Sequence, residues 1–189
     1  YVVWRGHRPG IYDNWDACKR QVEGFKNPRF KSFPNRSQAE VAYKEGAKEN
    51  ASNTEIIVPS ISVDAACSGN PGIMEYQGVD TATKDLIFHK GPFLMGTNNI
   101  GEFLALVHAL ALLKKENNPM PVYSDSRTAI AWVKKKQVKS NLVRNDQTKK
   151  LWELIDRAEN WLRTNTYPNK ILKWETEIWG EIPADFGRK

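Results

Sequence analysis

The sequence predicts an α/β fold in which a mixed five-stranded sheet carries flanking helices and follows a small ββαβα module. Three strand-like segments come one after another beyond residue 55, separated only by short turns, which favours antiparallel pairing. An apolar helix, a short strand, two further helices and a last short strand follow, and this order places helices against a sheet. We divide the 189 residues into a module at 1–46, a linker at 47–54 and a larger domain at 55–189.

Composition limits the classes of function. Apolar residues make up 40% of the chain, and no apolar run approaches the ~20 residues that span a membrane. The net charge of +6 favours a polyanionic partner. Cys18 and Cys67 lie far apart, so we expect reduced thiols in a cytoplasmic protein and no cysteine metal cluster. No export leader is recognisable, and we expect a monomer without an obligate protein partner.

The module at 1–46 combines basic and aromatic residues. We expect two short strands around a Gly/Pro turn, a helix capped by Asp13 or Asn14, a strand at 30–33 and a helix at 37–47 that begins with a capping box. Residues 1–50 contain ten Lys/Arg and six Asp/Glu, a net charge of +4. This mixture suits a nucleic acid, because cations neutralise phosphates and flat rings pack on sugars or bases. The alternative is that Trp15, Phe30 and Phe33 simply form the core of the module.

The module also carries a set of residues typical of a known domain. These are Tyr1-Val2-Val3-Trp4-Arg5-Gly6, Gly10-Ile11-Tyr12, Trp15, Cys18-Lys19, Gln21-Val22 and Phe30-Lys31-Ser32-Phe33. They resemble the hybrid-binding domain at the N-terminus of many ribonucleases H1. In that family, an aromatic pair grips the DNA strand of an RNA/DNA hybrid, while a loop and a basic strand meet the RNA. The resemblance places these contacts on Tyr1, Trp15, Phe30, Lys31 and Ser32.

The polar segment at 47–54 is predicted to be a short flexible linker. In the larger domain, we expect strands at 56–63, 73–80, 86–94, 121–124 and 170–174, and helices at 100–115, 127–136 and 145–165. The first strand is rich in β-branched residues and ends at Asp64, which is followed by a turn of small residues through Gly72.

Four acidic residues occupy positions that this order of elements brings together. Asp64 and Asp125 each follow a strand, Glu102 lies in the first turn of the apolar helix, and Asp185 lies in the tail. Clustered carboxylates repel one another unless a divalent cation compensates their charge, and oxygen-only ligands suit Mg²⁺ or Mn²⁺ better than zinc. Each acid also has a structural alternative: Glu102 stabilises a helix N-terminus, and Asp125 caps the next helix.

The segments around these acids are Val63-Asp64-Ala65-Ala66-Cys67-Ser68-Gly69-Asn70-Pro71-Gly72, Thr97-Asn98-Asn99-Ile100-Gly101-Glu102, Tyr123-Ser124-Asp125-Ser126 and Trp179-Gly180-Glu181-Ile182-Pro183-Ala184-Asp185. They resemble ribonuclease H1, and most of all the bacterial branch typified by the Bacillus halodurans enzyme. The resemblance implies a ribonuclease H-like fold and hydrolysis of the RNA strand of RNA/DNA hybrids, leaving 5′-phosphate and 3′-hydroxyl ends.

The resemblance also assigns the catalytic residues. Asp64, Glu102, Asp125 and Asp185 become the ligands of two Mg²⁺ ions, for which Mn²⁺ substitutes, and Glu181 assists metal exchange and product release. Many relatives carry a histidine-bearing loop before the last aspartate. This chain lacks that loop, since its three histidines lie elsewhere.

Further contacts with the hybrid follow from the same resemblance. Gly69, Asn70, Asn98, Asn99 and Glu102 would contact RNA, and recognition of the 2′-hydroxyl needs such donors and acceptors. Arg127 stands where relatives often carry an amide that contacts RNA. Thr97, Asn99, Ser140 and Asn141 would hold a phosphate of the DNA strand, with Trp132 against its sugars. Two alternatives stay open: another nuclease of the same fold, such as a resolvase, and an inactive protein that binds hybrids or double-stranded RNA.

Overall fold

The computed structural model describes residues 1–52 and 55–187, with side chains except those of residues 47–52. The chain divides into two compact units, Tyr1–Ile56 and Ile57–Lys189. Among the residues described, no helix is both long enough and apolar enough to cross a membrane.

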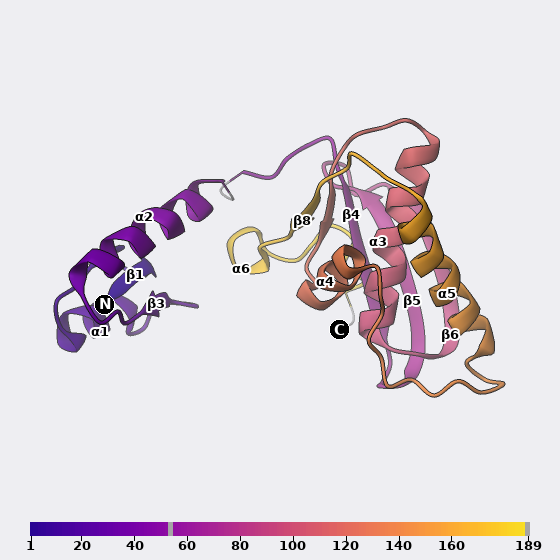
Figure 1. Cartoon of the computed structure of the whole chain (residues 1–189), viewed down its shortest axis with the longest axis horizontal. Helices are drawn as coiled ribbons and strands as arrows, with labels where there is room; N and C mark the ends of the chain where they lie inside the picture. Colours follow the sequence, from indigo (N-terminus) through magenta and orange to yellow (C-terminus); the bar gives the residue numbers. More distant parts are fainter. Residues whose placement is uncertain (53–54, 188–189) are drawn as a thin grey trace. The chain divides into compact units, whose positions relative to one another are not determined.

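The first unit is built on a three-stranded antiparallel sheet of order β2-β1-β3. Its elements are β1 (Val2–Arg5), β2 (Gly10–Ile11), α1 (Trp15–Val22), β3 (Arg29–Lys31) and α2 (Arg36–Ser52) (Figure 1). The side chain of Asn14 accepts a hydrogen bond from the Ala17 N–H at 2.8 Å and so caps α1 as expected. Among the described side chains of this unit, the buried apolar ones are Val2, Val3, Cys18, Val22 and Ala39.

Helix α2 is longer than predicted. It begins at Arg36, because Asn35 Oδ1 rather than Ser37 accepts the capping hydrogen bond, from the Gln38 N–H at 2.9 Å. It continues to Ser52, into the segment predicted to be a flexible linker. Residues 47–52 contain alanine, lysine and glutamate without glycine or proline, and these are good helix formers. The linker prediction is therefore corrected for 47–52, and residues 53–54 lie outside the described part.

The second unit contains the predicted mixed five-stranded sheet, of order β6-β5-β4-β7-β8. The first three strands along the chain pair antiparallel, and the last two run parallel to β4. The strands are β4 (Ile61–Cys67), β5 (Gly72–Asp80), β6 (Leu86–Gly96), β7 (Val122–Ser124) and β8 (Ile171–Lys173). The sheet thus has an antiparallel half and a parallel half that meet at β4.

Strand β4 is displaced from its predicted position at 56–63. Ile57 and Val58 are exposed, and the Ile57 N–H donates to the hydroxyl of Tyr123 rather than to a neighbouring strand. Pro59 has no N–H to donate to a ladder, and the strand begins beyond it, at Ile61. Asp64 therefore lies in the middle of β4 and not at its end.

Four helices complete this unit: α3 (Asn98–Lys115), α4 (Arg127–Lys135), α5 (Lys149–Thr164) and α6 (Thr176–Trp179). Thr97 caps α3 by accepting from the Ile100 N–H at 3.3 Å. Figure 1 shows α3 and α5 side by side against the sheet, and apolar residues of both helices form one core with Val63 and Ala65 of β4. Because side chains alternate along a strand, Asp64 points to the opposite face.

Two details of the helices differ from expectation. Helix α5 begins at Lys149 rather than at 145, because Asn145 Oδ1 accepts from the N–H groups of Gln147 and Thr148 and closes a turn ahead of the helix. The short helix α6 was not predicted. It lies in the tail, where Trp174 and Ile182 pack with Tyr123 in a small separate cluster.

Candidate active site

Three of the four predicted acids converge in the second unit. One carboxylate oxygen from each of Asp64, Glu102 and Asp125 lies within 4.8 Å of the other two. They come from the middle of β4, from α3 and from the residue after β7. Asp64 and Glu102 are buried, with 0% and 1% of their surface exposed, and Asp125 is half-buried. We call these three residues the carboxylate cluster.

Contacts around the cluster explain how each acid is held. Glu102 Oε1 accepts a hydrogen bond from the backbone N–H of Ala65 at 3.3 Å, which ties α3 to β4. Ser126, and not Asp125, caps α4, because its hydroxyl accepts from the Ala129 N–H at 3.1 Å. The capping alternative for Asp125 is therefore wrong, and its carboxylate faces the cluster.

The cluster fits a divalent cation. Oδ2 of Asp64 and Oε2 of Glu102 are buried and accept no hydrogen bond, although both carboxylates have other interactions. Three carboxylates this close in a buried setting repel one another unless positive charge is brought in. All the ligand atoms are oxygens, the set that Mg²⁺ and Mn²⁺ prefer.

The two acids of the tail lie outside this group. Asp185 is half-buried, and its Oδ2 accepts from the Gly187 N–H at 2.9 Å. Glu181 is exposed. Gln77 Nε2 of β5 donates to the Ala184 carbonyl at 2.6 Å and attaches the tail to the sheet, and Trp174 Nε1 donates to the Gly180 carbonyl at 2.9 Å within the tail.

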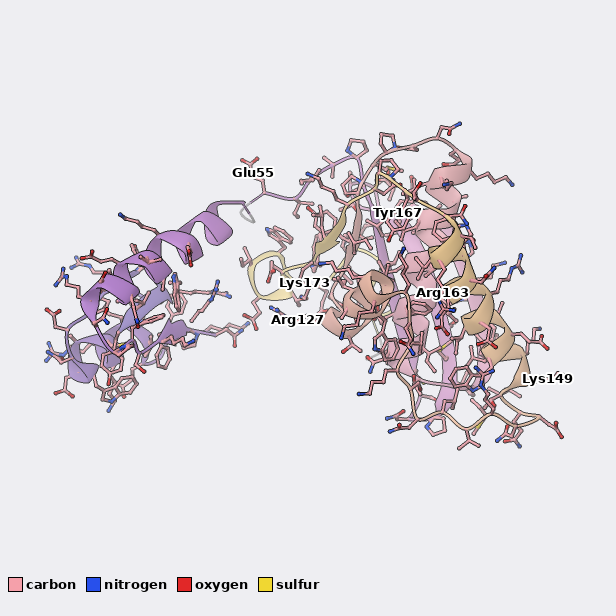
Figure 2. The ribbon with its side chains drawn as sticks, in the orientation of Figure 1. Glu55, Arg127, Lys149, Arg163, Tyr167 and Lys173 are labelled. Carbon is pink, nitrogen blue, oxygen red and sulfur yellow. The ribbon has the colours of Figure 1, made fainter. Side chains whose placement is uncertain are left out.

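A polar groove of about 760 Å³ begins at the same end of α3 as Glu102. It contains eight of the ten residues to which the family resemblance assigns hybrid contacts in the larger domain: Gly69, Asn70, Thr97, Asn98, Asn99, Trp132, Ser140 and Asn141. Arg127 does not line it and is exposed at the first residue of α4 (Figure 2). The groove also contains Lys139, which we had not singled out; it closes the basic run at 134–139, the signal that could have identified it.

A larger cavity, of about 1060 Å³, lies elsewhere in the unit, between β6, α3 and α5. None of the predicted site residues lines it. Burial and the nearby charge of Lys90 lower the pKa of His108 in its wall, and burial raises the pKa of Tyr76 to about 12. This cavity is separate from the carboxylate cluster.

In the first unit, three aromatic rings form a surface patch. Ring centroids are 5.6 Å apart for Tyr1 and Trp15 and 5.7 Å apart for Trp15 and Phe30. Trp15 is 43% exposed and Phe30 39% exposed, so neither belongs to the core, and that alternative is wrong for both. Lys31, the last residue of β3, and Ser32, which follows it, are also exposed. We call Tyr1, Trp15 and Phe30 the aromatic patch.

Comparison with known families identifies both units. Residues 59–167 match the family model for RNase H, and residues 1–43 match the model for the ribonuclease H1 N-terminal domain. Because the first match alone covers more than half of the 189 residues, the chain belongs to the RNase H family of enzymes.

Individual relatives match smaller parts or match more weakly. A ribonuclease H of Crithidia fasciculata is 49% identical over 39 residues, which are 21% of this chain and only 8% of that protein. Among solved structures, LC11 RNase H1, isolated from compost, is 21% identical over 62% of this chain and 84% of its own, with a TM-score of 0.44. RNase H1 from the archaeon Halobacterium salinarum is 19% identical over 61% of this chain and 83% of its own, with a TM-score of 0.41. The same LC11 enzyme has been solved in complex with an RNA/DNA hybrid, at 20% identity, 62% and 86% coverage and a TM-score of 0.38.

Proposed function

We propose that the protein is an endonuclease that hydrolyses the RNA strand of RNA/DNA hybrids and leaves 5′-phosphate and 3′-hydroxyl ends. The observation that carries this proposal is the convergence of the Asp64, Glu102 and Asp125 carboxylates within 4.8 Å. The polar groove begins at the same end of α3, so a nucleic acid bound there would pass close to the cluster. Membership of the RNase H family supports the same reaction.

Two Mg²⁺ ions, replaceable by Mn²⁺, would be held by the carboxylate cluster together with Asp185. When bound, such cations activate water and stabilise the leaving 3′ oxygen. The protein contributes rigidity: Asp64 is fixed in the middle of a central strand, and Glu102 is tied to that strand through Ala65. Glu181, exposed four residues before Asp185, is suited to assist metal exchange and product release.

The polar groove supplies the groups that distinguish RNA from DNA. Asn70, Asn98 and Asn99 present amides, and Gly69 lets a strand approach its backbone; these suit a 2′-hydroxyl, which both donates and accepts hydrogen bonds. Hydroxyl and amide groups of Thr97, Ser140 and Asn141, with the Lys139 cation, suit a phosphate of the DNA strand. The half-buried Trp132 would pack on its sugars, and Arg127 would add an RNA contact at the exposed start of α4.

The first unit would provide a second binding site for the same hybrid duplex. We assign residues 1–46 to a hybrid-binding domain, 47–54 to the connection and 55–189 to the catalytic domain. The aromatic patch would pack on the DNA strand, and Lys31 and Ser32 would meet the RNA. Deleting residues 1–50 should raise KM and reduce processivity with little change in the single-turnover rate; an unchanged KM would contradict this role.

Within the family, we assign the chain to the bacterial branch typified by the Bacillus halodurans enzyme, which the segments around the four acids resemble most. We also infer a monomer that works in the cytoplasm without an obligate protein partner. Cys18 and Cys67 are both free, which suits a reducing compartment.

The decisive experiment compares a labelled RNA/DNA hybrid with duplex DNA, branched DNA and double-stranded RNA, each with and without Mg²⁺. Cleavage of the RNA strand of the hybrid alone, and only with metal, is expected. Asp125→Asn should keep hybrid binding and lose cleavage. Cutting of branched DNA would identify a resolvase instead, and binding of the hybrid without cleavage would identify an inactive binding protein.

A further inference from the structure

Asp64 belongs to a row of polar residues that crosses three strands. In the antiparallel register, Asp64 of β4 lies opposite Gln77 of β5, and Gln77 lies opposite His89 of β6. Directly opposed residues project from the same face of a sheet, with Cβ atoms about 5 Å apart. Gln77 and His89 are therefore on the face that carries Asp64, away from α3 and α5.

This row holds the tail on both sides of Asp185. Gln77 Nε2 donates to the carbonyl of Ala184 at 2.6 Å. The His89 ring meets Phe186 edge-on, with centroids 6.2 Å apart, and His89 Nε2 is 2.9 Å from Glu75 Oε2. The neighbours of Asp185 in sequence are thus fixed to β5, which pairs with the strand that bears Asp64, and to β6 beyond it.

We propose that Gln77 is the residue that positions Asp185 for metal binding. This inference rests on the proposed function, in which Asp185 is a ligand. Asp185 lies in no helix or strand; its N–H donates to the Ile182 carbonyl at 2.9 Å in a turn, and the Gln77 side chain anchors this turn to β5. Gln77 fixes the preceding carbonyl from the position directly opposite Asp64, which ties the fourth acid to the first. A glutamine amide does so without adding a charge that would compete with the cations.

The carboxylate of Asp185 is held by the tail, whereas the backbone before it is held by the sheet. Its Oδ2 accepts from the Gly187 N–H, a contact within the tail itself. With the carbonyl of Ala184 held by Gln77 and Ala184 fully buried, the proposal requires the Asp185 carboxylate to turn toward the cations about its own side-chain torsions and to give up its hydrogen bond with the Gly187 N–H. Because Gln77 already orders the backbone before Asp185, less conformational entropy is lost when Asp185 binds the cations.

The test replaces Gln77 by methionine, which is similar in length but has no donor, and by asparagine, which keeps the amide one methylene shorter. Gln147→Met, at an exposed position before α5, is the matched control. Two readouts do not depend on turnover: amide hydrogen exchange of residues 182–187 and the affinity for Mn²⁺ by titration calorimetry. Because one hydrogen bond contributes about 1 kcal/mol, Gln77→Met should accelerate exchange and weaken Mn²⁺ binding by about fivefold each. Gln77→Asn should fall between that variant and the unsubstituted protein.

A double-mutant comparison shows whether Gln77 acts through Asp185. In an Asp185→Asn background, Gln77→Met should weaken Mn²⁺ binding no further, since the ligand it positions is already removed. If the two substitutions weaken Mn²⁺ binding independently, so that their effects multiply, the proposal is overturned. It is also overturned if Gln77→Met accelerates exchange in the tail without changing the Mn²⁺ affinity, or changes neither. Thermal melting checks folding, and Gln77→Asn provides the measurement if the methionine variant does not fold. Failure of the unsubstituted protein to cleave hybrids would refute the proposed function itself and is observed separately.

Discussion

Glu102 and Ala65 are joined by a hydrogen bond in which the Ala65 N–H donates to Glu102 Oε1 at 3.3 Å. Ala65 directly follows Asp64 on β4, so this bond fixes the second acid against the strand that carries the first. Both carboxylates are therefore placed by regular elements rather than by loops, which favours precise ligand geometry.

Gly101 allows this close approach of α3 to β4. A Cβ at Gly101 would lie 2.7 Å from the Ala65 Cβ and 3.2 Å from the Met74 Cγ, both in the core. We predict that Gly101→Ala pushes α3 away, destabilises the protein by about 1–3 kcal/mol and lowers the rate of hybrid cleavage. Urea unfolding and single-turnover assays measure the two effects. Gly10→Ala, whose Cβ would meet only the Tyr12 ring at 3.7 Å, should change neither; equal effects of the two variants would contradict the explanation.

The carboxylate cluster makes stability dependent on metal. A cation that binds only the folded state at ten times its Kd stabilises it by about 1.4 kcal/mol, or about 3–6 °C in Tm. We predict that Mg²⁺ raises the Tm of the unsubstituted protein in this way. Asp64→Asn should raise the Tm in metal-free buffer, because it relieves repulsion among the three acids, and should remove most of the response to Mg²⁺. Melting curves in chelator and in Mg²⁺ test both statements, and a full Mg²⁺ response in Asp64→Asn would contradict the site.

The sequence predicted the mixed five-stranded sheet and acids of which three converge, but it placed the ends of individual elements less well. The antiparallel pairing of the first three strands followed from the short turns between them, which are local signals. The shift of β4 came from Pro59 and from the pairing of β4 with β5 through Asp64 and Gln77, and such pairing is not visible in one strand alone. Helix α2 continues to Ser52 because residues 47–52 have high helix propensity, whereas their polar composition alone had suggested a linker.

For the candidate site too, the sequence suggested some residues, and only the structure revealed others. The cluster and the polar groove contain residues that the family resemblance had suggested, because motif segments keep their chemistry near one another. The sequence does not single out Gln77, because a glutamine in a strand carries no distinctive pattern, whereas the basic run at 134–139 is a signal for Lys139. Gln77 matters because it lies opposite Asp64, and Lys139 because it lines the polar groove. Both positions are properties of the tertiary structure.

The aromatic patch should matter for binding and little for stability. Trp15 is 43% exposed and contacts Tyr1 and Phe30 at the surface. Base–aromatic stacking contributes about 1–3 kcal/mol per base, so Trp15→Ala should weaken hybrid binding by about five- to 150-fold, with a loss of folding stability below about 1 kcal/mol. Titration of a fluorescent hybrid and urea unfolding are the measurements. Val41→Ala, which trims an exposed apolar side chain on α2, is the control; unaltered affinity in Trp15→Ala would exclude the patch from binding.

His108 should make the fold less stable in mild acid. It lies on α3 with its ring stacked on Phe88 at 4.0 Å and its Nδ1 3.3 Å from the Tyr76 hydroxyl. Burial, and then the nearby charge of Lys90, lower its pKa from the usual value of 6.5. As the pH falls below about 6.5, the unfolded chain takes up the proton first, so protonation favours unfolding. The stability that His108 contributes is present above that pH and is lost as the pH falls through its lowered folded-state pKa.

Urea unfolding of the unsubstituted protein and of His108→Gln at several pH values between 5 and 7.5 tests this expectation. Stability of the unsubstituted protein should decline more steeply below pH 6.5 than that of His108→Gln, because glutamine does not titrate. Tyr76→Phe, which removes the hydroxyl next to Nδ1 and leaves burial nearly unchanged, should keep most of the pH dependence, since burial is the larger cause. His7→Gln, at an exposed position, is the control. It should keep the steep decline in stability below pH 6.5 that the unsubstituted protein shows. Parallel pH profiles for the unsubstituted protein and His108→Gln would show that another group is responsible.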